Sequence, residues 1–197
     1  MDQIRTASTI DVHAWSANPK KYADPHNSGQ KDDPGQKEGK PLYQPLHLAC
    51  LTWPEYPALA GHSDGDAAAH ALADALLQAA GVGEMGSVFG VDRPEFANAR
   101  GSVFLQEAAR LVHEAGWQVA SAQVQLICQE PRFAPRRSEA EEAMSSALGV
   151  NVIVSATTTD HLGFIGHDEG VAALASALVT RRTLLQRGLG YLGDMLF

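Results

Sequence analysis

The sequence has little cysteine, few basic residues and no long hydrophobic run, and each shortage excludes a class of protein. Its two cysteines among 197 residues, Cys50 and Cys128, lie far apart, which excludes a disulfide scaffold and a CxxC metal site. No stretch approaches the roughly 18 consecutive apolar residues of a membrane-spanning helix. Fifteen Lys and Arg against 23 Asp and Glu give a net charge of −8, so neither nucleic acid nor an anionic membrane is an expected partner.

The remaining composition is that of a globular protein, with 45% hydrophobic and 19% charged residues. Residues 1–15 lack the basic and apolar regions of a secretory signal, and with so few cysteines this predicts a cytoplasmic location. The length predicts a single domain, which we place at residues 1–187, followed by a C-terminal tail at residues 188–197. Within it, Asn18–Pro45 is rich in Pro, Gly and charge and poor in apolar residues, which predicts a flexible insertion.

Hydrophobic periodicity and glycine positions predict an alternation of strands and helices. Period-two patterns predict strands at Ile4–Trp15, Leu46–Trp53, Trp117–Cys128 and Asn151–Thr157. Helical spacing predicts helices at Asp64–Ala80, Ser102–Ala115, Ser138–Leu148 and Glu169–Gln186. No helix separates the first two predicted strands, so we expect them to pair with each other. The predicted fold class is α+β, with one sheet covered on one face by helices.

The first cluster of chemically useful side chains is Asp11 with His13. Two residues that are two positions apart on a strand point to the same face of the sheet. A carboxylate beside an imidazole suits a borderline metal ion such as Zn²⁺. Alone, this short pattern is common and carries little weight.

The second cluster, His62–His70, opens the first predicted helix. His70 follows Asp66 by four residues and therefore shares its helix face. In a metal-free interpretation, Ser63 or Asp64 caps the helix and Asp66 interacts favourably with its positive end. Capping explains one acid but not two histidines and two acids in nine residues, so both interpretations stay open.

The third cluster, Ser155–Asp160, lies where a predicted strand ends, before the glycine-containing segment Leu162–Gly170. Hydroxyl groups before a helix start can donate hydrogen bonds to a phosphate. Asp160 adds an oxygen ligand of the kind that Mg²⁺ prefers. On these residues alone, a threonine-rich strand end followed by a capped helix is the better explanation.

Together, in this order, the clusters resemble the 2-C-methyl-D-erythritol 2,4-cyclodiphosphate synthase family of the non-mevalonate route to isoprenoid and terpenoid precursors. The matching segments read Asp11-Val12-His13, His62-Ser63-Asp64-Gly65-Asp66 through His70, and Ala156-Thr157-Thr158-Thr159-Asp160 before Leu162-Gly163-Phe164. The resemblance implies a phosphorus-oxygen lyase. Its substrate would be 4-diphosphocytidyl-2-C-methyl-D-erythritol 2-phosphate, whose 2-phosphate attacks the β-phosphorus to give the cyclodiphosphate and CMP.

The resemblance also implies a homotrimer with active sites between neighbouring subunits, and a cytidine diphosphate compound as the small-molecule partner. Asp11, His13 and His70 would bind a divalent cation, usually zinc. Asp160 would help to place Mg²⁺ or Mn²⁺ on the diphosphate. His62 and Thr158 would be the catalytic residues. The implied substrate-binding residues are Asp11, His13, His62, Ser63, Glu84, Met85, Gly86, Phe89, Asp92, Arg93, Cys128, Gln129, Glu130, Pro131, Arg132, Phe133, Ala134, Thr157, Thr158, Thr159, Asp160, Phe164 and His167.

Several positions depart from the family pattern. Asp160 stands where the family has glutamate, His167 where it has arginine, and the Phe89–Arg93 segment lacks one acid. These departures leave an alternative: a trimeric metal-binding homologue with impaired or lost turnover. A third interpretation is a metal-dependent phosphohydrolase, for which His62 would supply the general base.

Overall fold

The computed structural model describes residues 3–19, 44–61, 63–90, 93, 96 and 99–181. The predicted tail at residues 188–197 lies outside the described residues, as does all but the ends of the predicted insertion at Asn18–Pro45. Among the described residues, no helix is long and apolar enough to cross a membrane.

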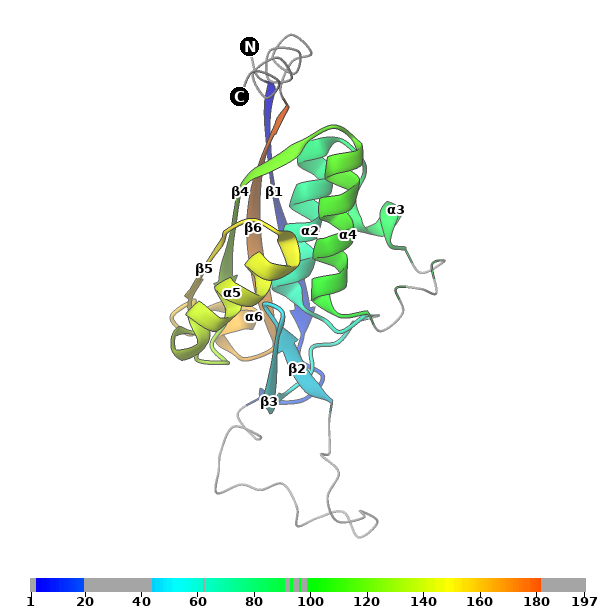
Figure 1. The fold of residues 1–197 in the computed structure, drawn as a ribbon. Coiled ribbons are helices and arrows are strands. Elements are labelled where there is room, and N and C mark those ends of the chain that lie inside the picture. The colour runs from blue at the N-terminus through cyan, green and yellow to red at the C-terminus, as the bar shows by residue number, and fades with distance from the viewer. Residues whose placement is uncertain are drawn as a thin grey trace, which may run out of the picture.

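The main sheet has four strands in the order β1, β6, β4, β5 (Figure 1). Their bounds are β1 Gln3–Ala14, β6 Gly170–Arg181, β4 Gln118–Ile127 and β5 Val152–Thr157. β6 pairs antiparallel with both β1 and β4, whereas β4 and β5 are parallel. β1 and β5 are therefore the two edge strands of this sheet.

Helices α2, α4 and α5 cover one face of the sheet (Figure 1). α2 (Ala67–Ala80) lies against β1 and β6, α4 (Gly101–Glu114) packs on α2, and α5 (Arg137–Leu148) packs beside β5 and α4. The described residues also contain three short helical turns: α3 (Met85–Val88), η2 (Ala134–Arg136) and α6 (Gly163–Gly166). The arrangement confirms the predicted α+β class.

The composition of α2 explains its close fit to the sheet. Apart from His70, its buried side chains are alanines and leucines, which bring the helix near the small residues Ala173, Ala175 and Ala177 of β6. Asp66 is its N-cap, accepting a hydrogen bond from the Ala69 amide, and Gly81 ends it in the left-handed conformation.

The predicted pairing of Leu46–Trp53 with the first strand is wrong. This segment folds instead into a separate hairpin of β2 (Pro45–Leu48) and β3 (Leu51–Pro57). The chain turns at Ala49 and Cys50, whose φ values of 55° and 61° lie in the left-handed region that usually calls for Gly or Asn. The Asp66 carboxylate accepts both of their backbone amides, at 2.8 and 2.6 Å, and so supports a turn that the local sequence does not signal.

The predicted closing helix at Glu169–Gln186 is also wrong, because most of this segment forms strand β6. Its buried residues recur with a period of two from Ala173 to Val179, as in a strand with one covered face. Pairing with β1 on one side and β4 on the other outweighs the helix propensity of its alanines.

The opposite face of the sheet carries exposed hydrophobic side chains. Ile10 is 68% exposed and pairs directly with Leu174, which is 38% exposed, so the two side chains share this face. Ile4 and Val12 lie on the same face of β1, and Ile153 of β5 is 56% exposed. Exposed apolar faces of this kind are typical of interaction surfaces.

Candidate active site

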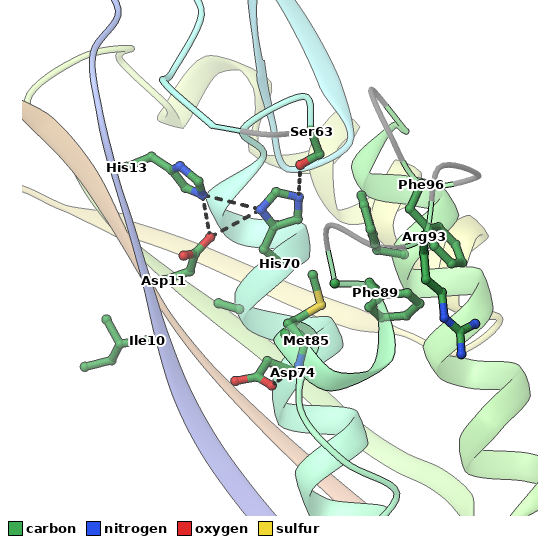
Figure 2. Close-up of a pocket in the computed structure, with 14 residues that line it drawn as sticks. Ile10, Asp11, His13, Ser63, His70, Asp74, Met85, Phe89, Arg93 and Phe96 are labelled. Carbon is green, nitrogen blue, oxygen red and sulfur yellow. Dashed lines mark hydrogen bonds and ion pairs between the residues drawn. The ribbon is translucent and has the colours of Figure 1, made fainter.

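Three side chains converge between the β1 edge of the sheet and the first turn of α2 (Figure 2). Asp11 and His13 come from β1, and His70 comes from α2. The His13 Nε2 atom lies 2.9 Å from Asp11 Oδ2 and 3.4 Å from His70 Nδ1. His70 Nδ1 lies 3.3 Å from the same carboxylate oxygen. The first predicted cluster, on β1, and the second, at the start of α2, thus meet at one point.

The donor set fits a tetrahedrally coordinated metal ion. An ion about 2.0–2.1 Å from each donor would hold the donors about 3.3 Å apart, close to the observed separations. The remote ring nitrogens already have partners: His13 Nδ1 donates to the Ala60 carbonyl at 2.6 Å, and His70 Nε2 is hydrogen-bonded to Ser63 Oγ at 3.0 Å. Such outer contacts fix the rings so that the remaining nitrogens face the ion.

The cluster is also strongly polarised without an ion. Burial raises the pKa of the Asp11 carboxyl, but hydrogen bonds from His13 and His70 outweigh burial and hold this pKa well below its usual range. For His13, burial lowers the pKa, while the hydrogen bond and charge of Asp11 outweigh it and raise the pKa. A negative carboxylate therefore stays between the two imidazoles, as a cation site needs.

The acids Asp64 and Asp66 hold the entry to α2 rather than joining this cluster. Asp66 is fully buried and accepts amide hydrogen bonds from Ala49, Cys50 and Ala69. The pKa of Asp66 is raised overall. Burial and the nearby Asp64 raise it by more than the hydrogen bonds from the Cys50 and Ala69 amides lower it. Asp64 accepts from the Asp66 amide at 3.1 Å and from the first amide of α4 at 2.7 Å. Both acids thus fix the element that carries His70.

A pocket of about 430 Å³ opens beside the three converging side chains (Figure 2). One wall is aromatic: Phe104 meets the His70 ring edge to face at a centroid distance of 5.1 Å, and Phe89 and Phe96 pack on Phe104. The predicted site residues that line it are Asp11, His13, Ser63, His70, Met85, Gly86, Phe89 and Arg93.

Several residues that line this pocket were not predicted from the sequence, including Phe96, Phe104 and Asp74. Asp74 lies one turn after His70 on α2, a spacing that was available as a signal. Its carboxylate accepts the Met85 amide at 2.9 Å and thereby holds the start of α3 against the pocket.

A second pocket, of about 590 Å³, lies beside β5. The predicted residues that line it are Cys128, Gln129, Glu130, Pro131, Arg132, Phe133, Ala134, Thr157 and Thr158; Pro135, Arg137, Ala156 and His161 were missed. Burial and Glu130 raise the pKa of the Cys128 thiol to about 12, which keeps it a protonated thiol at neutral pH. Cys128, which is only 4% exposed, is therefore a small buried side chain rather than a nucleophile.

The remaining predicted site residues lie outside both pockets or outside the described residues. Glu84 is the N-cap of α3, and His62 and Asp92 are not among the residues that the structure describes. Four residues follow β5 near the second pocket without lining it: Thr159, Asp160, Phe164 and His167.

The two pockets lie at opposite edges of the sheet. The metal-type cluster is on β1 and the second pocket is beside β5, with β6 and β4 between them. Three inter-strand spacings put these edges about 14 Å apart. Asp160, which follows β5, is consequently not brought to Asp11, His13 and His70 within one chain.

An Asp/His/His cluster with ordered outer hydrogen bonds beside an aromatic-walled pocket defines the class: a metal-dependent enzyme built on an α+β sheet. Residues 4–180 match the YgbB family. The chain belongs to this family, that of the 2-C-methyl-D-erythritol 2,4-cyclodiphosphate synthases.

Relatives and a solved structure agree with this assignment. The chain is 54% identical over 182 residues to the 2-C-methyl-D-erythritol 2,4-cyclodiphosphate synthase of Cutibacterium acnes, covering 92% of this chain and 94% of the relative. It is 53% identical to the bifunctional enzyme IspD/IspF of Clavibacter michiganensis, covering 70% of this chain but only 34% of that protein. A solved cyclodiphosphate synthase in a CDP-bound form superposes with a TM-score of 0.68 at 28% identity, covering 89% of this chain and 99% of that one.

Proposed function

We propose that this chain is a 2-C-methyl-D-erythritol 2,4-cyclodiphosphate synthase whose metal site lies at the β1 edge of its sheet. It converts 4-diphosphocytidyl-2-C-methyl-D-erythritol 2-phosphate into the cyclodiphosphate and CMP. The observation that carries this proposal is the Asp11, His13 and His70 cluster, in a chain 54% identical over nearly its whole length to a synthase of this name. The comparisons give no support to a homologue that has lost turnover.

Asp11, His13 and His70 would hold a divalent cation, and the two imidazoles with one carboxylate favour zinc. When bound, the ion supplies positive charge that offsets the charge of the substrate's phosphates. Ser63 and Ala60 keep the two imidazoles oriented through their remote nitrogens. The aromatic wall packs against the His70 ring and helps to fix its orientation.

The second pocket would take the cytidine half of the substrate. The CDP-bound form of the similar synthase supports a cytidine nucleotide as ligand. The 128–134 loop would surround the base, and Thr157, Thr158 and Thr159 would donate hydrogen bonds to the diphosphate. Asp160 would help to place Mg²⁺ or Mn²⁺ there. His62 and Thr158 would stabilise the transition state, in which the 2-phosphate attacks and CMP leaves without a side-chain nucleophile.

We further propose that the chain forms a homotrimer through the exposed face of its sheet. Ile10, Val12 and Leu174 give this face an apolar character that a partner would cover. The two pockets lie at opposite edges of the sheet, and these edges are about 14 Å apart, so each pocket would be completed by the complementary pocket of a neighbour. A cytoplasmic location remains part of this proposal.

The test is incubation of the purified protein with the diphosphocytidyl substrate, Zn²⁺ and Mg²⁺, followed by phosphorus NMR and a CMP assay. Cyclic diphosphate and equimolar CMP are expected. Release of free phosphate would point instead to a phosphohydrolase, and no product from folded, zinc-loaded protein would overturn the assignment.

A further inference from the structure

The hairpin of β2 and β3 contacts the loop of the second pocket through a residue with no role so far. Tyr56, near the end of β3, donates a hydrogen bond from its hydroxyl to Glu130 Oε2 at 2.9 Å. Glu130 lines the second pocket, 74 positions away in the sequence. The side chain of Tyr56 is half-buried, so this contact is partly shielded from solvent.

The surroundings of the Tyr56 hydroxyl keep it a hydrogen-bond donor. Burial and the Glu130 carboxylate raise the pKa of Tyr56 to about 12. The phenol therefore stays protonated at neutral pH and keeps donating to Glu130. This hydrogen bond ties the hairpin to the loop directly before Pro131.

Neighbouring contacts anchor the same loop to the hairpin. The Trp53 and Phe133 rings lie 6.0 Å apart between centroids, and Phe133 is only 3% exposed. The Arg136 guanidinium lies over the Trp53 ring at 4.4 Å and donates to the Thr52 carbonyl at 2.7 Å. Of the residues in these contacts, Phe133 and Glu130 line the second pocket, and the hydrogen bond from Tyr56 to Glu130 is the polar contact to that lining.

We propose that Tyr56 is a positioning residue for the nucleotide pocket, which it serves by holding the Glu130–Arg132 segment in its binding conformation. The identity of the ligand as a cytidine nucleotide rests on the proposed function. A loop that is already ordered loses less conformational entropy when a ligand binds, so the hydroxyl of Tyr56 strengthens nucleotide binding without touching the nucleotide.

The test compares Tyr56→Phe, which removes only the hydroxyl, with Thr52→Val, which removes a hydroxyl from the same hairpin. Thr52 Oγ1 contacts His47 and Arg100 but not the pocket loop. Calorimetry with CDP on the whole protein should show a Kd about 3- to 10-fold higher for Tyr56→Phe, as expected for one lost hydrogen bond, and an unchanged Kd for Thr52→Val. Substrate KM should rise by the same factor as the CDP Kd, with kcat and zinc affinity unchanged.

A second measurement separates this inference from the proposed function. Amide hydrogen exchange of the unliganded protein reports on the 128–134 loop whether or not CDP is the ligand. Faster exchange confined to this loop in Tyr56→Phe supports the positioning role. The positioning role is overturned if amide exchange of the loop is the same in Tyr56→Phe and the wild type. It is also overturned if the wild type binds CDP and Tyr56→Phe binds it with the same Kd, or if Tyr56→Phe loses zinc affinity by the same factor as CDP affinity.

Discussion

The His13 Nε2 and His70 Nδ1 atoms lie 3.4 Å apart although 57 positions separate the two residues. One imidazole stands on edge strand β1 and the other on the first turn of α2. Their remote nitrogens are held by Ala60 and Ser63, so the near nitrogens face a common point beside the Asp11 carboxylate. This relationship is the basis for treating the cluster as a preformed metal site.

Replacing His70 by alanine should abolish tight zinc binding while the fold is kept. Asp11 and His13 would remain, but two ligands on one strand cannot complete a tetrahedral site. We expect a loss of affinity of more than about 100-fold, beyond the 10- to 100-fold typical of a lost outer contact. Zinc titration with a competing chelator measures this. The matched control, His113→Ala, removes an exposed imidazole of α4 and should bind zinc like the wild type.

Replacing Ser63 by alanine should weaken zinc binding by about 10-fold, because the His70 ring loses the hydrogen bond at its remote nitrogen. The same competition titration measures the change. Ser146→Ala, on the exposed side of α5, is the control. Wild-type affinity in Ser63→Ala would mean that Phe104 and the Asp64 carboxylate, whose Oδ1 lies 3.7 Å from His70 Nε2, orient the imidazole without Ser63.

Replacing Gly101 by alanine should destabilise the fold at the contact between α2 and α4. An added Cβ would lie 2.6 Å from the Ala69 Cβ and 2.7 Å from Asp66 Oδ2. We expect a loss of about 1–3 kcal/mol in the free energy of unfolding, measured by urea denaturation. Gly86→Ala is the control, since an added Cβ there meets nothing within 4 Å. Equal stability of the two variants would contradict the close approach of the helices.

Acidification should destabilise the protein through His47. Burial and the Arg100 guanidinium, which donates to His47 Nδ1 at 2.8 Å, lower the pKa of His47, while Asp64 and Asp66 act in the opposite direction. Since the pKa is lower in the folded state than its unfolded value near 6.5, the unfolded state binds more protons as pH falls below about 7. The free energy of unfolding therefore starts to decrease as pH falls below about 7, and the decrease is complete once pH has fallen through the lower pKa of His47 in the folded state.

His47→Gln removes this titration but keeps an acceptor for Arg100. The Tm of the metal-free variant should therefore fall less between pH 7.5 and 5.5 than that of the metal-free wild type. Parallel Tm curves would show that His47 does not contribute to the acid sensitivity.

The three residues of the Asp11, His13 and His70 cluster could be singled out from sequence because their spacing is local. Asp11 and His13 share a strand face by period two, and His70 sits in a dense polar cluster at a helix start. Each half of the site could be identified within its own segment. The resemblance of the three clusters to one family then joined the halves.

The errors arose where tertiary contacts override local preference. The alanine-rich Val171–Val179 stretch has helix propensity, yet strands on both sides pair with it. The turn at Ala49 and Cys50 depends on the distant Asp66 carboxylate. Tyr56 could not be assigned for the same reason, because its partner Glu130 is supplied by another part of the fold.

In the proposed trimer, each active site combines the metal site of one chain with the nucleotide pocket of another. We expect His70→Ala and Thr158→Ala to be inactive alone, and mixing them under conditions that exchange subunits shows whether each supplies what the other lacks. Random assembly at equal amounts pairs an intact metal site with an intact pocket in about one quarter of sites. We therefore expect recovery of about 25% of wild-type activity, whereas a mixture as inactive as its components would show that the active site is not shared between chains.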